Sequence, residues 1–149
     1  MGLIPEEADR DFVAGTFIVQ EGEVLLLKHS KLGLWLQPGG HIEPGETPDE
    51  TARREAREET GVEVELVGER EELDSSVNLH EPFNVNLHPI REDHYHCDFQ
   101  FLARVKEEGE ASHAHEHDGT RWFSKDELDE GGVPENVRYT AREAIEYFE

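Results

Sequence analysis

Residues 40–62 constrain this chain more than any other segment, because a turn and a predicted helix carry an unusual pattern of charge there. The centre of the segment reads Arg54-Glu55-Ala56-Arg57-Glu58-Glu59. In a helix, Glu55, Glu58 and Glu59 stand at positions i, i+3 and i+4 and therefore share one face. Like charges at that spacing destabilise a helix by about 0.2–0.5 kcal/mol per pair, and a bound cation would turn that cost into a gain.

Capping residues predict where this helix begins and ends. Thr47 is a favourable N-cap, Pro48 suits the first helical position, and Glu50 has the capping-box spacing from Thr47. Gly61 is predicted to end the helix, because glycine readily adopts the left-handed conformation of a C-terminal cap. We therefore expect a helix from Pro48 to about Thr60.

The type of side chain on this helix indicates the kind of ligand. Carboxylate oxygens are hard donors, which favour Mg²⁺ or Mn²⁺. Mg²⁺ usually binds through one or two carboxylates together with substrate phosphates. The preceding pair Gly39-Gly40 can bring main chain close to a ligand, because neither residue has a side chain. These residues predict a metal-dependent site that acts on a diphosphate.

Alternating and continuous apolar patterns predict the remaining elements. Strands are expected at residues 12–19, 24–28, 62–67, 83–90, 95–105 and 121–123. Ser124 is expected to cap a short helix, and Pro134 to open a last helix that ends near Phe148. No internal repeat and no long linker interrupts the chain. Strands that flank helices at irregular spacing predict one α/β or α+β sandwich domain over residues 1–149.

The chain is strongly acidic, with a formal net charge of −22 from 14 basic and 36 acidic residues. That charge argues against a nucleic acid as partner, since phosphate backbones require a basic surface. It also argues against binding to anionic membranes. At molar salt the Debye length is only about 3 Å, so the composition suits a high-salt cytoplasm; an ordinary acidic protein is the alternative. No apolar run of 18 residues and no signal-like N-terminus is present, and a cytoplasmic location is expected.

The segment of residues 40–62 also matches the Nudix box in every charged position. The nine matching positions are Gly40, Glu46, Arg54, Glu55, Ala56, Glu58, Glu59, Gly61 and Val62. Only Ala56 is smaller than the bulky aliphatic residue that is usual there. The resemblance extends over about residues 12–130, through the approach Trp35-Leu36-Gln37-Pro38-Gly39 and the far strand Arg121-Trp122-Phe123. The chain therefore resembles the Nudix hydrolase superfamily.

This resemblance implies an α/β/α sandwich with a mixed sheet, in which the box forms a loop–helix–loop. It implies Mg²⁺- or Mn²⁺-dependent hydrolysis of a nucleoside diphosphate linked to another moiety, such as a nucleotide sugar, ADP-ribose or a nucleoside triphosphate. The implied partner is thus a small nucleotide, and a homodimer is plausible for the superfamily. The implied metal ligands are Glu55, Glu58, Glu59 and the backbone carbonyl of Gly39.

The other box residues have implied supporting roles, and the general base is open. Arg54 would orient the glutamates through charge-assisted hydrogen bonds, and Glu46 would support the loop or a bridging water. Glu58 or Glu59 is the first choice for the base. The rival is Glu116, which lies six residues before Trp122, where Nudix proteins often place an acidic residue that faces the site.

Several residues outside the box have both a functional and an ordinary interpretation. His94 and His96 share a predicted strand face with Asp98 and could line the substrate cleft or bind a second metal; otherwise they form a polar strand face. Together with His88, these residues resemble a Nudix subgroup whose substrates are not assigned. Trp35 could stack on a base or pack in the core. A further alternating group is either a metal-binding motif or an exposed loop: His113, His115 and His117.

Two other functions remain possible for a chain with this box. Some Nudix-fold proteins isomerise isopentenyl diphosphate, but the short chain and the intact box weigh against that activity. Others are non-catalytic nucleotide sensors, which commonly have damaged boxes. A phosphate-release screen would separate these functions from hydrolysis.

Overall fold

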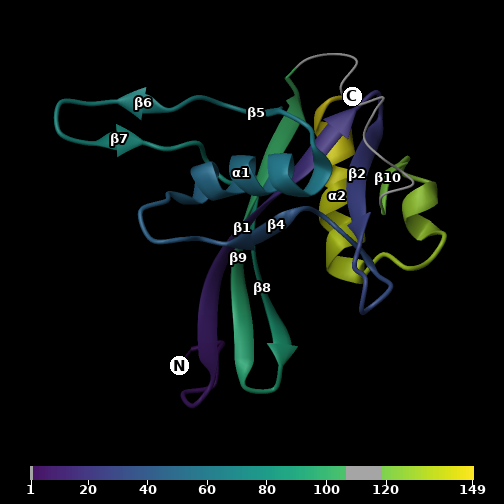
Figure 1. Cartoon of the computed structure of the whole chain (residues 1–149), viewed down its shortest axis with the longest axis horizontal. Coiled ribbons are helices and arrows are strands. Elements are labelled where there is room, and N and C mark those ends of the chain that lie inside the picture. The colour runs from purple at the N-terminus through teal and green to yellow at the C-terminus, as the bar shows by residue number, and fades with distance from the viewer. Residues whose placement is uncertain (1, 107–118) are drawn as a thin grey trace.

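The computed structural model describes residues 2–106 and 119–149, and a mixed sheet forms the centre of this part of the chain (Figure 1). The strand order is β10-β2-β1-β9-β5, with β3 beside β2, β4 beside β1 and β8 beside β9. Strands β1 and β9 run parallel, whereas the other described pairings are antiparallel. The strands are β1 (Asp9–Gln20), β2 (Glu23–Lys28), β3 (Trp35–Leu36), β4 (Gly39–His41), β5 (Val64–Leu66), β8 (Asn84–Arg91), β9 (His94–Val105) and β10 (Thr120–Phe123).

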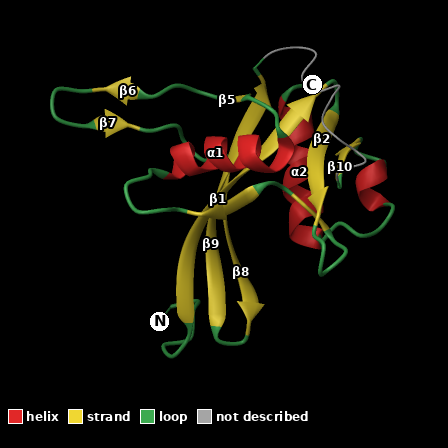
Figure 2. Ribbon diagram, viewed as in Figure 1, coloured by secondary structure: helices red, strands yellow, loops and turns green. Residues whose placement is uncertain are grey.

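Helices α1 (Pro48–Thr60) and α2 (Glu135–Tyr147) cover opposite faces of this sheet (Figure 2). Side chains alternate along β1, so that Ala14 and Ile18 pack with α1 while Phe17 and Val19 pack with α2. The small residues Ala52 and Ala56 let α1 lie close to the sheet. This arrangement confirms the predicted α/β architecture with a mixed sheet.

The predicted helix bounds of the box are also confirmed. The backbone N–H of Thr47 donates to the Glu50 carboxylate at 3.0 Å, as expected of a capping box. At the other end, Gly61 has a φ of 76°, and its N–H donates to the carbonyl of Arg57 at 2.9 Å. The local sequence therefore sets both ends of α1.

Several elements differ from the sequence prediction: β1 begins three residues earlier than expected, and the short strands β3 and β4 were not predicted. Strand β5 begins two residues later than expected, because the N–H of Val62 donates to the Thr60 hydroxyl instead of a neighbouring strand. Residues 69–81, which have no clear pattern, contain a small hairpin of β6 (Glu71–Glu72) and β7 (Val77–Asn78). Ser124 forms the predicted capping box with Glu127, but it opens only a 3₁₀ turn, η3 (Glu127–Asp129).

The ends of β1, β8 and β9 nearest the N-terminus extend past both helices (Figure 1). On one face of these strand ends lie polar side chains that are only partly buried: Asp11, His88, His94 and His96. No helix in the described part of the chain is long and apolar enough to cross a membrane.

Candidate active site

Three glycines let the box approach the sheet closely. A β-carbon on Gly15 of β1 would lie 2.6 Å from the carbonyl oxygen of Pro38, and one on Gly39 would lie 2.8 Å from the carbonyl oxygen of Ala14. A β-carbon on Gly40 would overlap the Glu55 carboxylate. Gly15 and Gly39 therefore need glycine for space, whereas a side chain at Gly40 would displace the Glu55 carboxylate. As a result, the α1 carboxylates reach the backbone of β4.

Arg54 lies at the centre of the charged residues. Its Nε and Nη2 donate to the two carboxylate oxygens of Glu46 at 2.6 and 3.0 Å, which is a bidentate pair. Its Nη1 donates to Glu55 at 3.1 Å and to Glu58 at 3.0 Å. One guanidinium therefore fixes three carboxylates, as the organising role predicted for Arg54 requires.

Glu46 is held as a charged anchor of the loop before α1. Hydrogen bonds from Arg54 and then from the Thr51 hydroxyl, at 2.7 Å, lower the pKa of Glu46 to about 2. The backbone N–H of Glu43 also donates to it, at 3.2 Å. A carboxylate with so low a pKa is a poor proton acceptor at neutral pH, so its supporting role is favoured over a role as base.

Glu59 has the opposite environment. Burial, together with the charges of Glu55 and Glu58, raises its pKa to about 7, even though the Gly39 N–H donates to its Oε1 at 2.7 Å and opposes this shift. Burial also raises the pKa of Glu55, against the opposing effect of Arg54. The three glutamates therefore carry more negative charge than Arg54 neutralises.

This excess charge fits a divalent cation. The donors are hard carboxylate oxygens on one helix face, beside the backbone of Gly39, and they suit Mg²⁺ or Mn²⁺ better than a softer metal. Glu55, Glu58, Glu59 and the Gly39 carbonyl remain the predicted ligands, and the structure brings all four residues together.

We expect the metal-free protein to lose stability as pH rises from about 4.5 to above 7. The pKa of Glu59 lies above its ordinary value of 4.5, so its protonated form stabilises the fold at low pH and that contribution is lost as pH rises through about 7. Solvent screens part of the effect, which should be about 1 kcal/mol. Urea unfolding at pH 5 and pH 8 measures it.

The control for this titration is the Glu59→Gln variant, which removes the titrating group. Its stability should fall less between the two pH values, and added Mg²⁺ should stabilise the wild type at pH 8 more than the variant. An identical pH dependence in both proteins would contradict the assignment.

The other predicted site residues occupy different places. Trp35 packs edge-on against Phe123 with ring centroids 5.2 Å apart, and its backbone N–H donates to Gly132. Its contact with the α2-side core supports the packing role, while base stacking stays a prediction. Four predicted residues lie outside the described part of the chain: His113, His115, Glu116 and His117.

A buried polar network joins β9 to the residue that precedes Pro38-Gly39. Asp98 is only 4% exposed, and its Oδ2 accepts from Gln37 at 3.2 Å and from Gln100 at 3.0 Å. Asn84 of β8 donates to Gln100 at 2.9 Å. Sequence reasoning placed Asp98 on the polar strand face but missed Gln37, whose contact with Asp98 depends on the fold.

The predicted histidines lie on the same side of the sheet. Nε2 of His94 is 3.0 Å from Oδ2 of Asp11, and the His96 ring lies 5.4 Å from both the His94 and the His41 rings and 5.7 Å from the His88 ring. Sequence reasoning missed Asp11 and His41, since Asp11 joins this group through the pairing of β1 with β9, and His41 through the pairing of β4 with β1.

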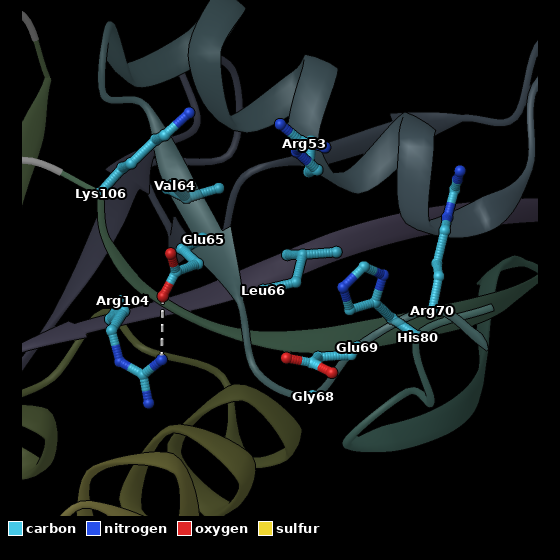
Figure 3. A pocket seen from close by; sticks show the side chains of 10 residues that line it. All are labelled: Arg53, Val64, Glu65, Leu66, Gly68, Glu69, Arg70, His80, Arg104 and Lys106. Carbon is cyan, nitrogen blue, oxygen red and sulfur yellow. Dashed lines mark hydrogen bonds and ion pairs between the residues drawn. The ribbon is translucent and has the colours of Figure 1, made fainter. Parts of the chain in front are cut away.

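Next to α1, a cavity of about 630 Å³ includes Arg53, Arg70 and His80 in its wall but none of the three box glutamates (Figure 3). Beside it, Asp49 is only 1% exposed and accepts from Arg70 at 2.9 and 3.0 Å. The ring Nδ1 of His80 is 3.0 Å from the same carboxylate. Asp49 therefore links α1 to Arg70 and His80, the residues that flank the β6–β7 hairpin.

Replacing Asp49 by alanine is expected to destabilise the protein by about 2–4 kcal/mol, because it leaves Arg70 and His80 without their buried partner. Urea unfolding measures the change. Arg53→Ala is the matched control, since Arg53 lines the same cavity and forms no ion pair with any described residue. A loss in Asp49→Ala no larger than in this control would contradict the anchoring role.

Comparisons with known proteins agree with this geometry. A NUDIX domain model matches residues 9–148. The asymmetrical bis(5'-nucleosyl)-tetraphosphatase of Mus musculus is 31% identical over 127 residues, which cover 84% of this chain and 80% of that protein. A probable DHNTP pyrophosphohydrolase of Lactococcus lactis is 32% identical over 101 residues, 67% of this chain and 57% of that protein.

Solved structures show the same fold. The crystal structure of a NUDIX-family hydrolase from Clostridium perfringens has a TM-score of 0.77 and 31% identity, and the match covers 95% of this chain and 99% of that one. The Ap4A hydrolase of C. elegans has a TM-score of 0.62 at 16% identity, with 93% and 95% of the two chains covered. The second likeness bears on the fold alone.

Proposed function

Since this chain belongs to the NUDIX domain family and is a Nudix hydrolase, we propose that it hydrolyses a phosphoanhydride bond of a nucleotide with a divalent cation bound at α1. The observation that carries the proposal is the set of three glutamates that Arg54 and the β4 backbone hold together. Neither an isomerase nor a sensor is favoured by any contact described above.

The protein side of the reaction follows from the same contacts. A bound Mg²⁺ or Mn²⁺ supplies neutralisation of phosphate oxygens and makes water more acidic. Arg54 holds Glu55 and Glu58 in place. Glu59 is the base in our proposal: its Oε1 accepts from the Gly39 N–H, and its Oε2 is left to take the proton of the attacking water. The pKa of Glu59 in the metal-free protein is about 7, and a cation bound beside it would lower that pKa, so Glu59 would be an ionised carboxylate able to accept a proton at neutral pH. Glu58 and Glu116 remain the rival bases.

We propose dinucleoside tetraphosphates as the first substrates to test. The support is the tetraphosphatase similarity, which spans 84% of this chain. Such a nucleotide is also a nucleoside diphosphate linked to another moiety, which is the class that the box implies. The net charge of −22 repels any polyphosphate, so binding should depend strongly on the loaded cation.

A hydrolysis screen with Mg²⁺ tests the proposal, with the products separated by ion-exchange chromatography, because cleavage within these substrates yields phosphomonoesters or pyrophosphate instead of free phosphate. The panel contains dinucleoside polyphosphates, nucleotide sugars, ADP-ribose and nucleoside triphosphates, with isopentenyl diphosphate as the isomerase substrate. Product formation from at least one nucleotide is the expected result. No product from any of them would favour a sensor, and a rearranged product from isopentenyl diphosphate would favour the isomerase.

The same screen at low and molar salt tests the proposed high-salt cytoplasm. We expect stability and turnover to be higher at molar salt, because screening reduces repulsion among the 36 acidic residues. Full stability in dilute buffer would contradict a halophilic origin.

Light scattering during gel filtration tests the proposed homodimer.

A further inference from the structure

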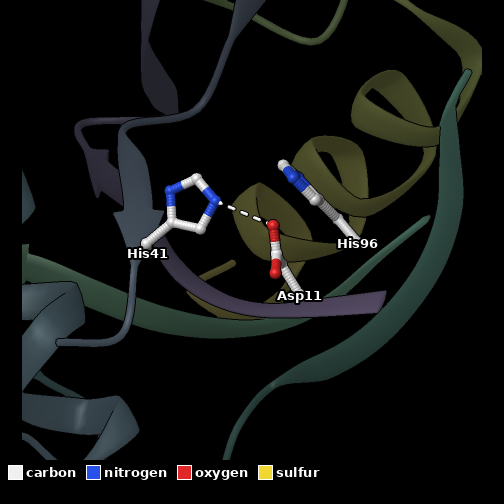
Figure 4. A group of neighbouring side chains, drawn as sticks. All are labelled: Asp11, His41 and His96. Carbon is white, nitrogen blue, oxygen red and sulfur yellow. Dashed lines mark hydrogen bonds and ion pairs between the residues drawn. The ribbon is translucent and has the colours of Figure 1, made fainter. Parts of the chain in front are cut away.

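A group of histidines and an aspartate lies on the sheet at the edge of the box. Asp11 and His96 are directly paired across the parallel strands β1 and β9, so their side chains point to the same face. His41 comes from β4, where it pairs with Val13, two residues along β1 from Asp11. One ligand atom from each of the three residues lies within 4.8 Å of the other two (Figure 4).

We propose that Asp11, His41 and His96 form a site for a borderline divalent cation such as Zn²⁺, separate from the carboxylate site on α1. Imidazole nitrogens with one carboxylate oxygen suit zinc, whereas Mg²⁺ prefers oxygen alone. Three protein ligands leave one tetrahedral position open for water or an anion. This proposal does not rest on hydrolysis, and metal binding can be measured without a nucleotide.

The spacing requires only small adjustments to accept such an ion. Oδ2 of Asp11 lies 3.3 Å from Nε2 of His41. Two ligands of a tetrahedral zinc, with bonds of about 2.0–2.1 Å, lie about 3.3 Å apart. His41 is 64% exposed, so its ring is free to turn, while His96 is half-buried and fixed on the central strand β9.

Neighbouring side chains can orient these ligands. Nε2 of His94 lies 3.0 Å from Oδ2 of Asp11, the contact by which ligand carboxylates are commonly held in metal sites. The Nδ1 of His88 contacts Asn86 at 2.9 Å, and its ring lies edge-on to His96.

The site also adjoins the box. His41 is the second residue after Gly39, and its carbonyl oxygen accepts from Nη2 of Arg54 at 3.4 Å. An ion held here would place additional positive charge near Arg54 and the carboxylates that it binds. Its ligands nevertheless differ from the three glutamates, so each site can be removed without deleting a ligand of the other.

Cobalt is the probe for this site, because Co²⁺ replaces zinc and gives visible d–d absorption in nitrogen-containing sites. The full-length protein is freed of metal with a chelator, dialysed, and titrated with Co²⁺ in excess Mg²⁺, which occupies the carboxylate site. We expect a saturable signal of one equivalent that Zn²⁺ displaces. We also expect Zn²⁺ to raise the melting temperature.

Three variants test whether these residues bind the ion. His41→Ala should weaken Co²⁺ binding at least about tenfold, and it removes a side chain that is 64% exposed, so little loss of stability is expected. Asp11→Asn should have the same effect while it preserves the side-chain shape. His96→Asn should abolish the signal; circular dichroism confirms that each variant is folded.

Two controls separate this site from the other possible metal sites. The triple variant His113→Ala, His115→Ala, His117→Ala and the single variant Glu59→Gln should both keep the cobalt signal. If the triple variant loses the signal while His41→Ala and Asp11→Asn keep it, the proposal is wrong and the histidine-rich segment binds the ion. Absence of any cobalt signal in the wild type would also overturn it.

Discussion

Replacing Glu59 by glutamine is expected to lower kcat at least about 10³-fold on any nucleotide that the wild type hydrolyses. The variant removes both a predicted cation ligand and the proposed base, and general bases alone contribute about 10²–10⁴-fold. The fold should survive, because glutamine can keep the hydrogen bond from the Gly39 N–H. Loss of the charge should even relieve the unfavourable burial, and the repulsion from Glu55 and Glu58, that raise the pKa of Glu59.

Steady-state kinetics at saturating Mg²⁺ give this result directly. Glu143→Gln removes the same charge from an exposed position on α2 and should retain full turnover. Glu58→Gln provides the internal comparison: if it abolishes turnover while Glu59→Gln stays within about tenfold of the wild type, Glu58 is the base and the assignment is wrong. Calorimetric titration with Mn²⁺ shows how much of each loss arises from weaker metal binding.

Replacing Arg54 by alanine is expected to affect stability and activity together. The side chains of Arg54, Glu46 and Glu55 are 22%, 20% and 16% exposed, so the lost guanidinium leaves largely buried carboxylates uncompensated. We expect a loss of about 2–4 kcal/mol in the free energy of unfolding. Turnover should fall at least about 10²-fold, because the glutamates lose their common hydrogen-bond donor.

Urea unfolding and kinetics on the same samples check both effects. Arg57→Ala is the matched control: Arg57 lies on the same helix, is 61% exposed and contacts Glu63 only at 3.8 Å, so its loss should cost little. Arg54→Lys keeps the charge but not the bidentate geometry. Compared with Arg54→Ala, it should recover more of the stability than of the turnover. An Arg54→Ala variant as stable and active as Arg57→Ala would contradict the organising role.

The parts of the site that lie within one local segment could be predicted from the sequence. Capping residues set the ends of α1, and the helical repeat placed Glu55, Glu58 and Glu59 on one face before the sheet was known. The alternation along β9 likewise placed His94, His96 and Asp98 together. Each of these inferences depends on geometry that a single helix or strand determines.

The parts that depend on pairing between distant strands could not be predicted. Asp11 and His96 are 85 positions apart and meet only through the register of β1 and β9. The contact of Asp49 with Arg70 crosses 21 positions and joins a helix to a hairpin that has no clear sequence pattern. A single sequence carries little information on register when, as here, polar residues line both partners.

The most direct test of the central claim is the metal dependence of hydrolysis. The initial rate of the wild type is measured on the panel nucleotide that it cleaves fastest, first with a chelator and then over a Mg²⁺ titration. We predict no turnover with the chelator and saturable recovery with Mg²⁺, which Glu59→Gln does not show. Equal hydrolysis without a divalent cation, or no hydrolysis of any panel nucleotide, would contradict a metal-dependent hydrolase built on these three glutamates.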